Sequence, residues 1–151
     1  MKRVLFVCSG NICRSPMAEF VFREMARRRR LTDVVDCESA GTNVFAPNSP
    51  VHNGTVRQLR RENIPYYQRG SRNVTVSDYG RFDYLLGMER SHVAAMERQL
   101  GGDPEGKMRR LLDFLSANGL PLQLGMPLYR RYGAQALEVL RDNPYLLVDE
   151  E

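Results

Sequence analysis

A thiol and a guanidinium near the start of the chain have the spacing of a reactive pair. Cys8 ends an apolar run that begins at Val4, and Arg14 follows after five intervening residues. A thiol surrounded by backbone amides and close to an arginine loses its proton readily, and the thiolate is a strong nucleophile. The arginine is planar and permanently charged, so it can bind two phosphate oxygens at once. Ser15, the next residue, is placed to donate a hydrogen bond to the thiolate.

The segments around this pair are predicted to form an anion site. A buried strand over residues 2–8 leads into a loop, and apolar residues at helical spacing predict an amphipathic helix from Ser15 to about Arg30. Loop amides and a helix N-terminus point donors at one place, where the helix dipole favours negative charge. Gly10 gives the loop conformational freedom, and Pro16 suits a first helical turn. This order of features favours a nucleophile beneath a bound phosphate over a structural cysteine beside a solvated arginine.

Strands and helices alternate along the rest of the chain, which predicts parallel strands with helices on both faces. Further strands are expected at 34–39, 82–88 and 110–114, and further helices at 51–63 and 91–100. Residues 40–50 are rich in Gly, Asn and Pro, which is typical of a loop. We therefore expect a three-layer α/β/α fold with a four-stranded parallel sheet and the phosphate-binding loop after the first strand. In such sheets ligands bind at the carboxyl ends of the strands.

Length, charge and cysteine content indicate the number of domains, the charge of the substrate and the redox environment of the protein. The 151 residues suit one domain, and the net charge of +4 suits an anionic substrate without indicating nucleic acid. No signal peptide or membrane-spanning stretch is visible in the sequence. Three cysteines, one of them a candidate nucleophile, favour a reducing cytoplasm. No metal site is expected, because no set of Cys and His residues has the spacing of metal ligands. His52 and His92 are expected either at the surface or in contact with residues that form the site.

The stretch VCSGNICRSPMAE, Val7 to Glu19, resembles the active-site loop of the low molecular weight protein tyrosine phosphatases. The resemblance continues through residues 39–42 and through FDYLLGMERSHV at 82–93, and it fades after about Phe114. It implies hydrolysis of phosphotyrosine proteins or small aryl phosphates, with inorganic phosphate as product and no cofactor. It implies catalytic roles for Cys8, Arg14 and Ser15, and phosphate binding by Ser9, Gly10, Asn11, Ile12, Cys13 and Arg14.

The same resemblance suggests supporting residues. It implies that Asn11 and Ser39 hydrogen-bond to each other and hold the loop open, and that Gln68 replaces a histidine of the family. Phe45 lies where the family places an aromatic wall beside the substrate ring, although an aromatic residue in a loop equally often fills a gap. Cys13 is close enough to Cys8 in sequence for a reversible disulfide, or it is simply packed.

The chain departs from the family at the general acid, an aspartate followed by proline and an aromatic residue. The corresponding stretch here reads GMPLY, with Met126 in the aspartate position, and neither Asp113 nor Asp142 is a confident substitute. We therefore expect a slow phosphatase. The alternative is a phosphate- or phosphopeptide-binding module with residual chemistry. An arsenate reductase is disfavoured because it needs further redox cysteines, and only Cys37, in an expected strand, lies downstream of the loop.

The tail, residues 115–151, carries a second resemblance. Its RRYG (130–133), ALEV (136–139) and NPY (143–145) stretches resemble a helix-hairpin-helix segment of DNA helicases related to the alpha subunit of exodeoxyribonuclease V. We expect one domain over residues 1–151, with a phosphatase-like body over 1–114 and a tail that is either recombined or divergent. No helicase activity is expected, because the tail lacks an ATPase motor and no Gly-Lys-Ser/Thr phosphate motif occurs. A nucleic-acid partner is not expected either, since the net charge of +4 is too modest to indicate one.

Overall fold

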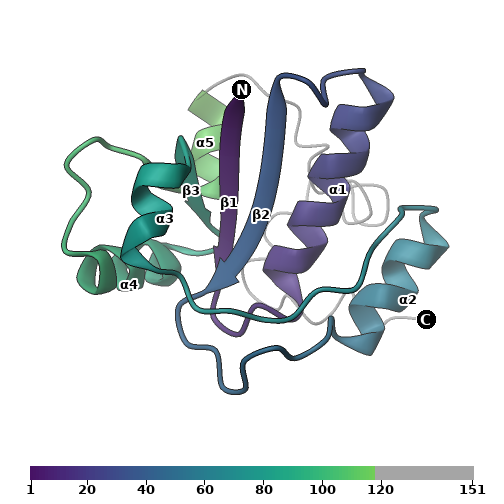
Figure 1. Ribbon diagram of the computed structural model, residues 1–151, viewed down its shortest axis with the longest axis horizontal. Helices are drawn as coiled ribbons and strands as arrows, with labels where there is room; N and C mark the ends of the chain where they lie inside the picture. The colour runs from purple at the N-terminus through teal and green to yellow at the C-terminus, as the bar shows by residue number, and fades with distance from the viewer. Residues whose placement is uncertain (118–151) are drawn as a thin grey trace.

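The computed structural model describes residues 1–117 (Figure 1). The expectations for Met126, for Asp142 and for the helicase-like stretches lie outside these residues. The elements, in chain order, are β1 (Lys2–Cys8), α1 (Arg14–Arg28), β2 (Val35–Gly41), α2 (Asn53–Arg61), α3 (Val76–Arg81), β3 (Tyr84–Gly87), α4 (Arg90–Leu100), β4 (Met108–Arg110) and α5 (Leu111–Ala117). None of the helices in this range has the length and apolar composition needed to cross a bilayer.

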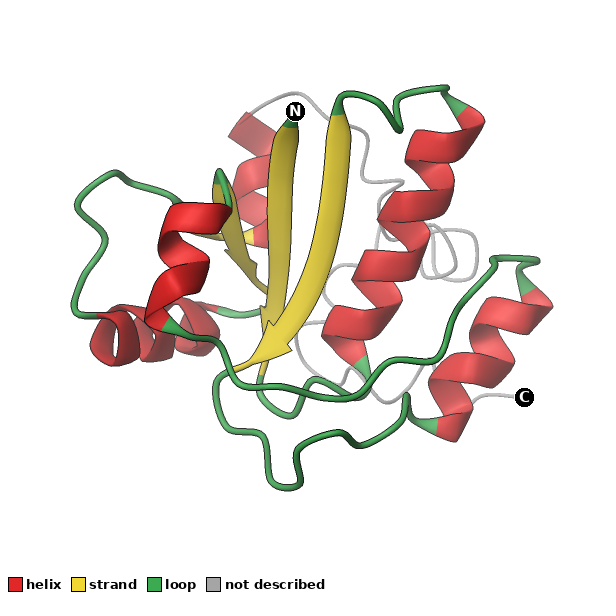
Figure 2. Cartoon of the chain, in the orientation of Figure 1, coloured by secondary structure: helices red, strands yellow, loops and turns green. Residues whose placement is uncertain are grey.

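The four strands form one parallel sheet in the order β2-β1-β3-β4. Helices flank the sheet on both sides (Figure 2), as the alternating pattern predicts. The expected α/β fold with a four-stranded parallel sheet is therefore confirmed. β1 lies between β2 and β3, and its last residue, Cys8, is paired with Gly41 at the carboxyl edge of the sheet.

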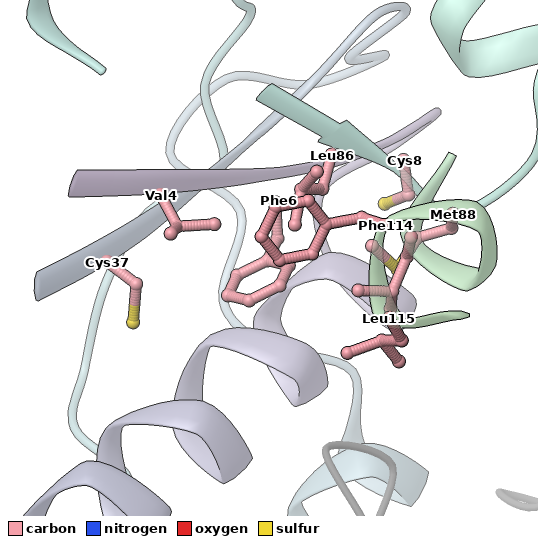
Figure 3. Packing of buried hydrophobic residues seen from close by; sticks show 9 residues of the cluster. Val4, Phe6, Cys8, Cys37, Leu86, Met88, Phe114 and Leu115 are labelled. Atoms are coloured by element: carbon pink, nitrogen blue, oxygen red, sulfur yellow. The ribbon is translucent and has the colours of Figure 1, made fainter. Parts of the chain in front are cut away.

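Alternate residues of β1 point to opposite faces of the sheet and enter two separate apolar clusters. Val4, Phe6 and Cys8 pack with residues of α5 (Figure 3). Phe22 of α1 packs against the same cluster. Leu5 and Val7 pack on the other face, where α4 contributes a fully buried methionine, Met96. Because both faces are covered, the central strand is buried along most of its length, which fixes the position of Cys8.

The expected strand at 110–114 is wrong. β4 ends at Arg110, and α5 begins at the next residue. Leu111, Phe114 and Leu115 recur at helical spacing, and all three pack into the cluster on the α1 face of the sheet. The adjacent leucines are compatible with either periodicity over so short a run. Burial of the helical face against the sheet decides between them.

The helix α3 was not expected from the sequence, since six residues are too few to show a periodic pattern. A capping box defines its start: the Thr75 side chain and the Asp78 side chain each bond the other residue's backbone amide. Asp78 is fully buried and forms an ion pair of 2.8 Å with Arg72. These hydrogen bonds and this pair hold the pKa of Asp78 below its usual range despite the opposing effect of burial.

Candidate active site

The loop between β1 and α1, residues 9–13, lies at the carboxyl edge of the sheet. Its carbonyl oxygens are bound by neighbouring segments: the amides of Thr42, Asn43 and His52 donate to Cys8, Ser9 and Ile12 at 2.9, 3.0 and 2.8 Å. These three carbonyls are therefore satisfied by protein instead of facing a bound anion. The loop packs so tightly on β2 that a Cβ at Gly41 would collide with the Ser9 carbonyl oxygen.

Cys8 lies at the base of this loop with its side chain almost fully buried, at 3 % exposure. Its sulfur is 3.0 Å from Ser15 Oγ and accepts a hydrogen bond of 3.3 Å from the amide of Asn11. Both groups can donate to the sulfur, and two donors stabilise negative charge there. The expected Cys8–Ser15 contact is thus present.

Arg14, the first residue of α1, is held by a carboxylate that the sequence reasoning missed. Its Nη1 lies 2.8 Å from Oε1 of Glu89, and the Arg14 side chain is 14 % exposed. Glu89 caps α4 directly after β3, so it stands at the same edge of the sheet as Cys8. An acidic residue just beyond an expected strand was the available signal. The pair restricts the guanidinium to one orientation beside the loop.

Asn11 forms hydrogen bonds that connect the loop to other segments of the chain. Its backbone is left-handed, with φ of 56°, and its Nδ2 donates to Ser15 Oγ at 2.9 Å and to Ser39 Oγ at 3.0 Å. The Asn11–Ser39 bond implied by the resemblance is therefore present. Arg69, and not Gln68, reaches the loop, donating to both oxygens of Asn11. Neighbours in an extended segment point to opposite sides, and Gln68 instead lines a separate pocket beside Arg60.

The loop also contains Ser9, Gly10, Ile12 and Cys13. Hydrogen-bond partners are defined for three of them, Ser9, Ile12 and Cys13. The amide of Asn43 binds the Ser9 carbonyl, and that of His52 binds the Ile12 carbonyl. Cys13 is buried and accepts a hydrogen bond of 3.3 Å from the Thr55 hydroxyl. Gly10 adopts no left-handed conformation; Asn11 does so instead. Phosphate binding by these residues stays a prediction.

Phe45 is fully exposed, which excludes the gap-filling interpretation of this aromatic residue. Its role as a wall beside a substrate ring stays a prediction. Cys37, in contrast, is buried, and burial raises the pKa of its thiol far above the ordinary range. A thiol that keeps its proton near neutral pH is a poor nucleophile for thiol–disulfide exchange.

Asp113 does not have the environment of a general acid. It lies in the first turn of α5 and pairs with Arg110 at 2.8 Å. The hydrogen bond from Arg110 holds the pKa of Asp113 below its usual range, so this carboxyl is ionised near neutral pH. A general acid needs the opposite, a proton retained until the leaving group takes it.

His92 is buried, so of the two positions that the sequence suggested, at the surface or supporting the site, it has the supporting one. Its Nδ1 accepts a hydrogen bond of 3.0 Å from the Glu89 amide, which completes the cap of α4. Burial, and then the nearby charge of Arg14, lower its pKa from 6.5 to about 4. The imidazole is therefore neutral at pH 7 and supports the carboxylate that holds Arg14.

Replacing His92 with Gln is expected to flatten the dependence of stability on pH. The unfolded chain binds a proton at His92 near pH 6.5, but the folded protein does so only at about pH 4. Protonation therefore favours unfolding as the pH falls through this window, by up to about 3 kcal/mol. Gln still accepts the Glu89 amide bond, but it does not titrate. Urea unfolding of both proteins across the window measures the difference, and an unchanged slope in His92→Gln contradicts it.

Comparison with known proteins agrees with this geometry. The family described as low molecular weight phosphotyrosine protein phosphatase matches residues 3–141. The phosphatase YfkJ of Bacillus subtilis is 38 % identical over 120 residues, which cover 80 % of this chain and 77 % of YfkJ. PtpA of Staphylococcus epidermidis is also 38 % identical, over 114 residues, 76 % of this chain and 71 % of PtpA.

Two solved structures share the fold. The crystal structure of YfkJ has a TM-score of 0.73 and 33 % identity, covering 83 % of this chain and 86 % of that one. The phosphatase of Streptococcus pyogenes has a TM-score of 0.69 and 30 % identity, covering 91 % and 98 %. The match over most of the chain, together with a buried cysteine at the end of the strand that leads into the loop, shows that this protein belongs to the low molecular weight protein tyrosine phosphatase family.

Proposed function

We propose that this phosphatase hydrolyses phosphotyrosine and small aryl phosphates through a phosphocysteine on Cys8. The observation that carries the proposal is the position of the Cys8 sulfur, which is buried at the base of the loop, lies 3.0 Å from Ser15 Oγ and accepts a hydrogen bond from the Asn11 amide. A nucleophile so held needs no metal to attack phosphorus, and the start of α1 supplies an electropositive surround for the phosphate.

In the first step the Cys8 thiolate attacks phosphorus, and the bond from phosphorus to the aryl oxygen breaks with its electron pair on that oxygen. Arg14 and the loop amides from Ser9 to Arg14 hold the three non-bridging oxygens as their charge rearranges. In the second step water attacks phosphorus, and the sulfur–phosphorus bond breaks with its electron pair on the Cys8 sulfur. Inorganic phosphate leaves with both protons of the water, and the thiolate is restored. Ser15 donates to the sulfur in both steps and so stabilises it as nucleophile and as leaving group.

We further propose that the reaction is slow on poor leaving groups, since Met126 occupies the position of the family's aspartate. The protein acts as a single domain in the reducing cytoplasm. The family match extends to residue 141, which supports a divergent phosphatase tail over a recombined helicase segment. Nucleic acid is not part of the proposed function.

A phosphopeptide-binding module is the second candidate, favoured by an ordered loop combined with the absent aspartate. Phosphorus-31 NMR of the enzyme mixed with excess aryl phosphate at low temperature separates the two. The phosphatase gives a transient thiophosphate resonance and accumulating inorganic phosphate. Tight phosphopeptide binding without either signal contradicts the proposal and favours the binding module.

A further inference from the structure

The Arg69 guanidinium binds Asn11 of the phosphate loop through both of its terminal nitrogens. Nη1 donates to the Asn11 carbonyl oxygen at 2.8 Å, and Nη2 donates to Oδ1 of the same residue. The Arg72 amide donates to the same Oδ1 at 3.0 Å. A planar fork bound to one main-chain and one side-chain oxygen fixes both the backbone and the side chain of Asn11. That restraint matters because Asn11 has a left-handed backbone, which costs energy in residues other than glycine.

Arg69 also sets the direction of the hydrogen bonds beyond Asn11. A guanidinium only donates, so Oδ1 must face Arg69 and Nδ2 must face the two hydroxyl groups of Ser15 and Ser39. Ser15 Oγ then accepts from Asn11, and its own proton is free for another acceptor. The Cys8 sulfur lies 3.0 Å away and the Ala40 carbonyl oxygen 3.4 Å away. The shorter contact and the charge of a thiolate favour donation to the sulfur.

A carboxylate fixes the other end of the same chain of hydrogen bonds. The buried Glu19 accepts from Ser39 Oγ at 2.6 Å and from the Tyr67 hydroxyl. A carboxylate only accepts, so Ser39 donates to Glu19 and is left to accept from Asn11. With a pure donor, Arg69, at one end and a pure acceptor, Glu19, at the other, every bond between them has one direction.

We propose that Arg69 is a positioning residue for the phosphatase reaction, holding Asn11 so that Ser15 and the Asn11 amide both donate to the Cys8 sulfur. The inference rests on the proposed phosphocysteine mechanism, in which that sulfur is nucleophile and then leaving group. Arg69 itself touches neither the sulfur nor the substrate in this account. Its hydrogen bonds act on the sulfur through Asn11 and Ser15. Its charge also interacts with Cys8 directly, and Arg69→Lys keeps that charge.

The test compares Arg69→Met, Arg69→Lys and a control, Arg60→Met. Arg60 donates to the Tyr66 hydroxyl on the far side of the 65–68 segment, so its loss removes the same charge without touching Asn11. We expect Arg69→Met to lower kcat on an aryl phosphate about 10- to 100-fold, the effect of losing hydrogen bonds to a charged group. The midpoint pH for alkylation of Cys8 by iodoacetamide should rise as well. Arg69→Lys, with the charge but not the fork, should fall between Arg69→Met and the parent.

Alkylation needs no substrate, so this readout does not depend on the phosphatase reaction being correct. If the parent forms no thiophosphate, the proposed function fails while the alkylation profile still reports on Arg69. If Arg69→Met only lowers the melting temperature, and matches Arg60→Met in kcat and in alkylation midpoint, Arg69 is merely structural and the inference is overturned. Equal losses in Arg69→Met and Arg60→Met would overturn it too, since they indicate an effect of net charge.

Discussion

Replacing Cys8 with Ser is expected to reduce turnover of an aryl phosphate by at least about 10⁴-fold, the scale seen when a covalent nucleophile is removed. A serine hydroxyl does not ionise near neutral pH, and the partners of the Cys8 sulfur within residues 1–117, Ser15 and the Asn11 amide, are not bases. The hydroxyl still fits between Ser15 and the Asn11 amide, so the loop should keep its shape. Initial rates on p-nitrophenyl phosphate measure the effect.

Cys37→Ser makes the same atomic change at a buried thiol outside the site. The Cys37 sulfur donates to the Glu19 carbonyl oxygen at 3.4 Å, and a hydroxyl can make the same bond. This control should therefore keep the parent rate. The Cys8→Ser variant should also bind inorganic phosphate, because the loop amides and Arg14 remain. Substantial turnover by Cys8→Ser would rule out the thiolate mechanism.

The rate of the parent enzyme should fall steeply as the pKa of the leaving group rises. Nitrophenolate leaves without a proton, whereas tyrosine needs one as its bond to phosphorus breaks. The loss of a positioned general acid typically costs about 10²–10⁴-fold. We expect a penalty of that size for phenyl phosphate and phosphotyrosine relative to p-nitrophenyl phosphate. A series of substituted phenyl phosphates, measured at one pH under single-turnover conditions, gives the slope.

Met126→Asp provides the matched gain-of-function variant. It restores a carboxyl at the position proposed above to correspond to the family's acid. It should speed the poor leaving groups more than the good ones and so flatten the slope. A slope that is already flat in the parent would show that an acid exists elsewhere. Asp142→Asn would then be the first replacement to test, since the Arg110 pair keeps Asp113 ionised.

The chemistry of this chain could be predicted from sequence because its reactive part is local. Cys8, Arg14 and Ser15, the residues proposed to react, lie within one strand, loop and helix start, so their spacing is visible in the sequence. The parallel sheet followed from the alternation of elements for a similar reason. The strand at 110–114 failed since two adjacent leucines fit either periodicity, and only packing against the sheet made that segment a helix.

Tertiary structure determines which distant residues contact the loop. Glu89 is 75 positions from Arg14, and Arg69 is 58 positions from Asn11. Their contacts depend on how β3 pairs with β1 and on the path of the extended segment after α2. Neither is encoded in local spacing, and Gln68 and Arg69 look equally suitable until the segment's orientation is known. The sequence by itself determined the loop that carries the proposed nucleophile, whereas only the folded chain selected the charged groups that contact this loop, because such groups meet through long-range packing.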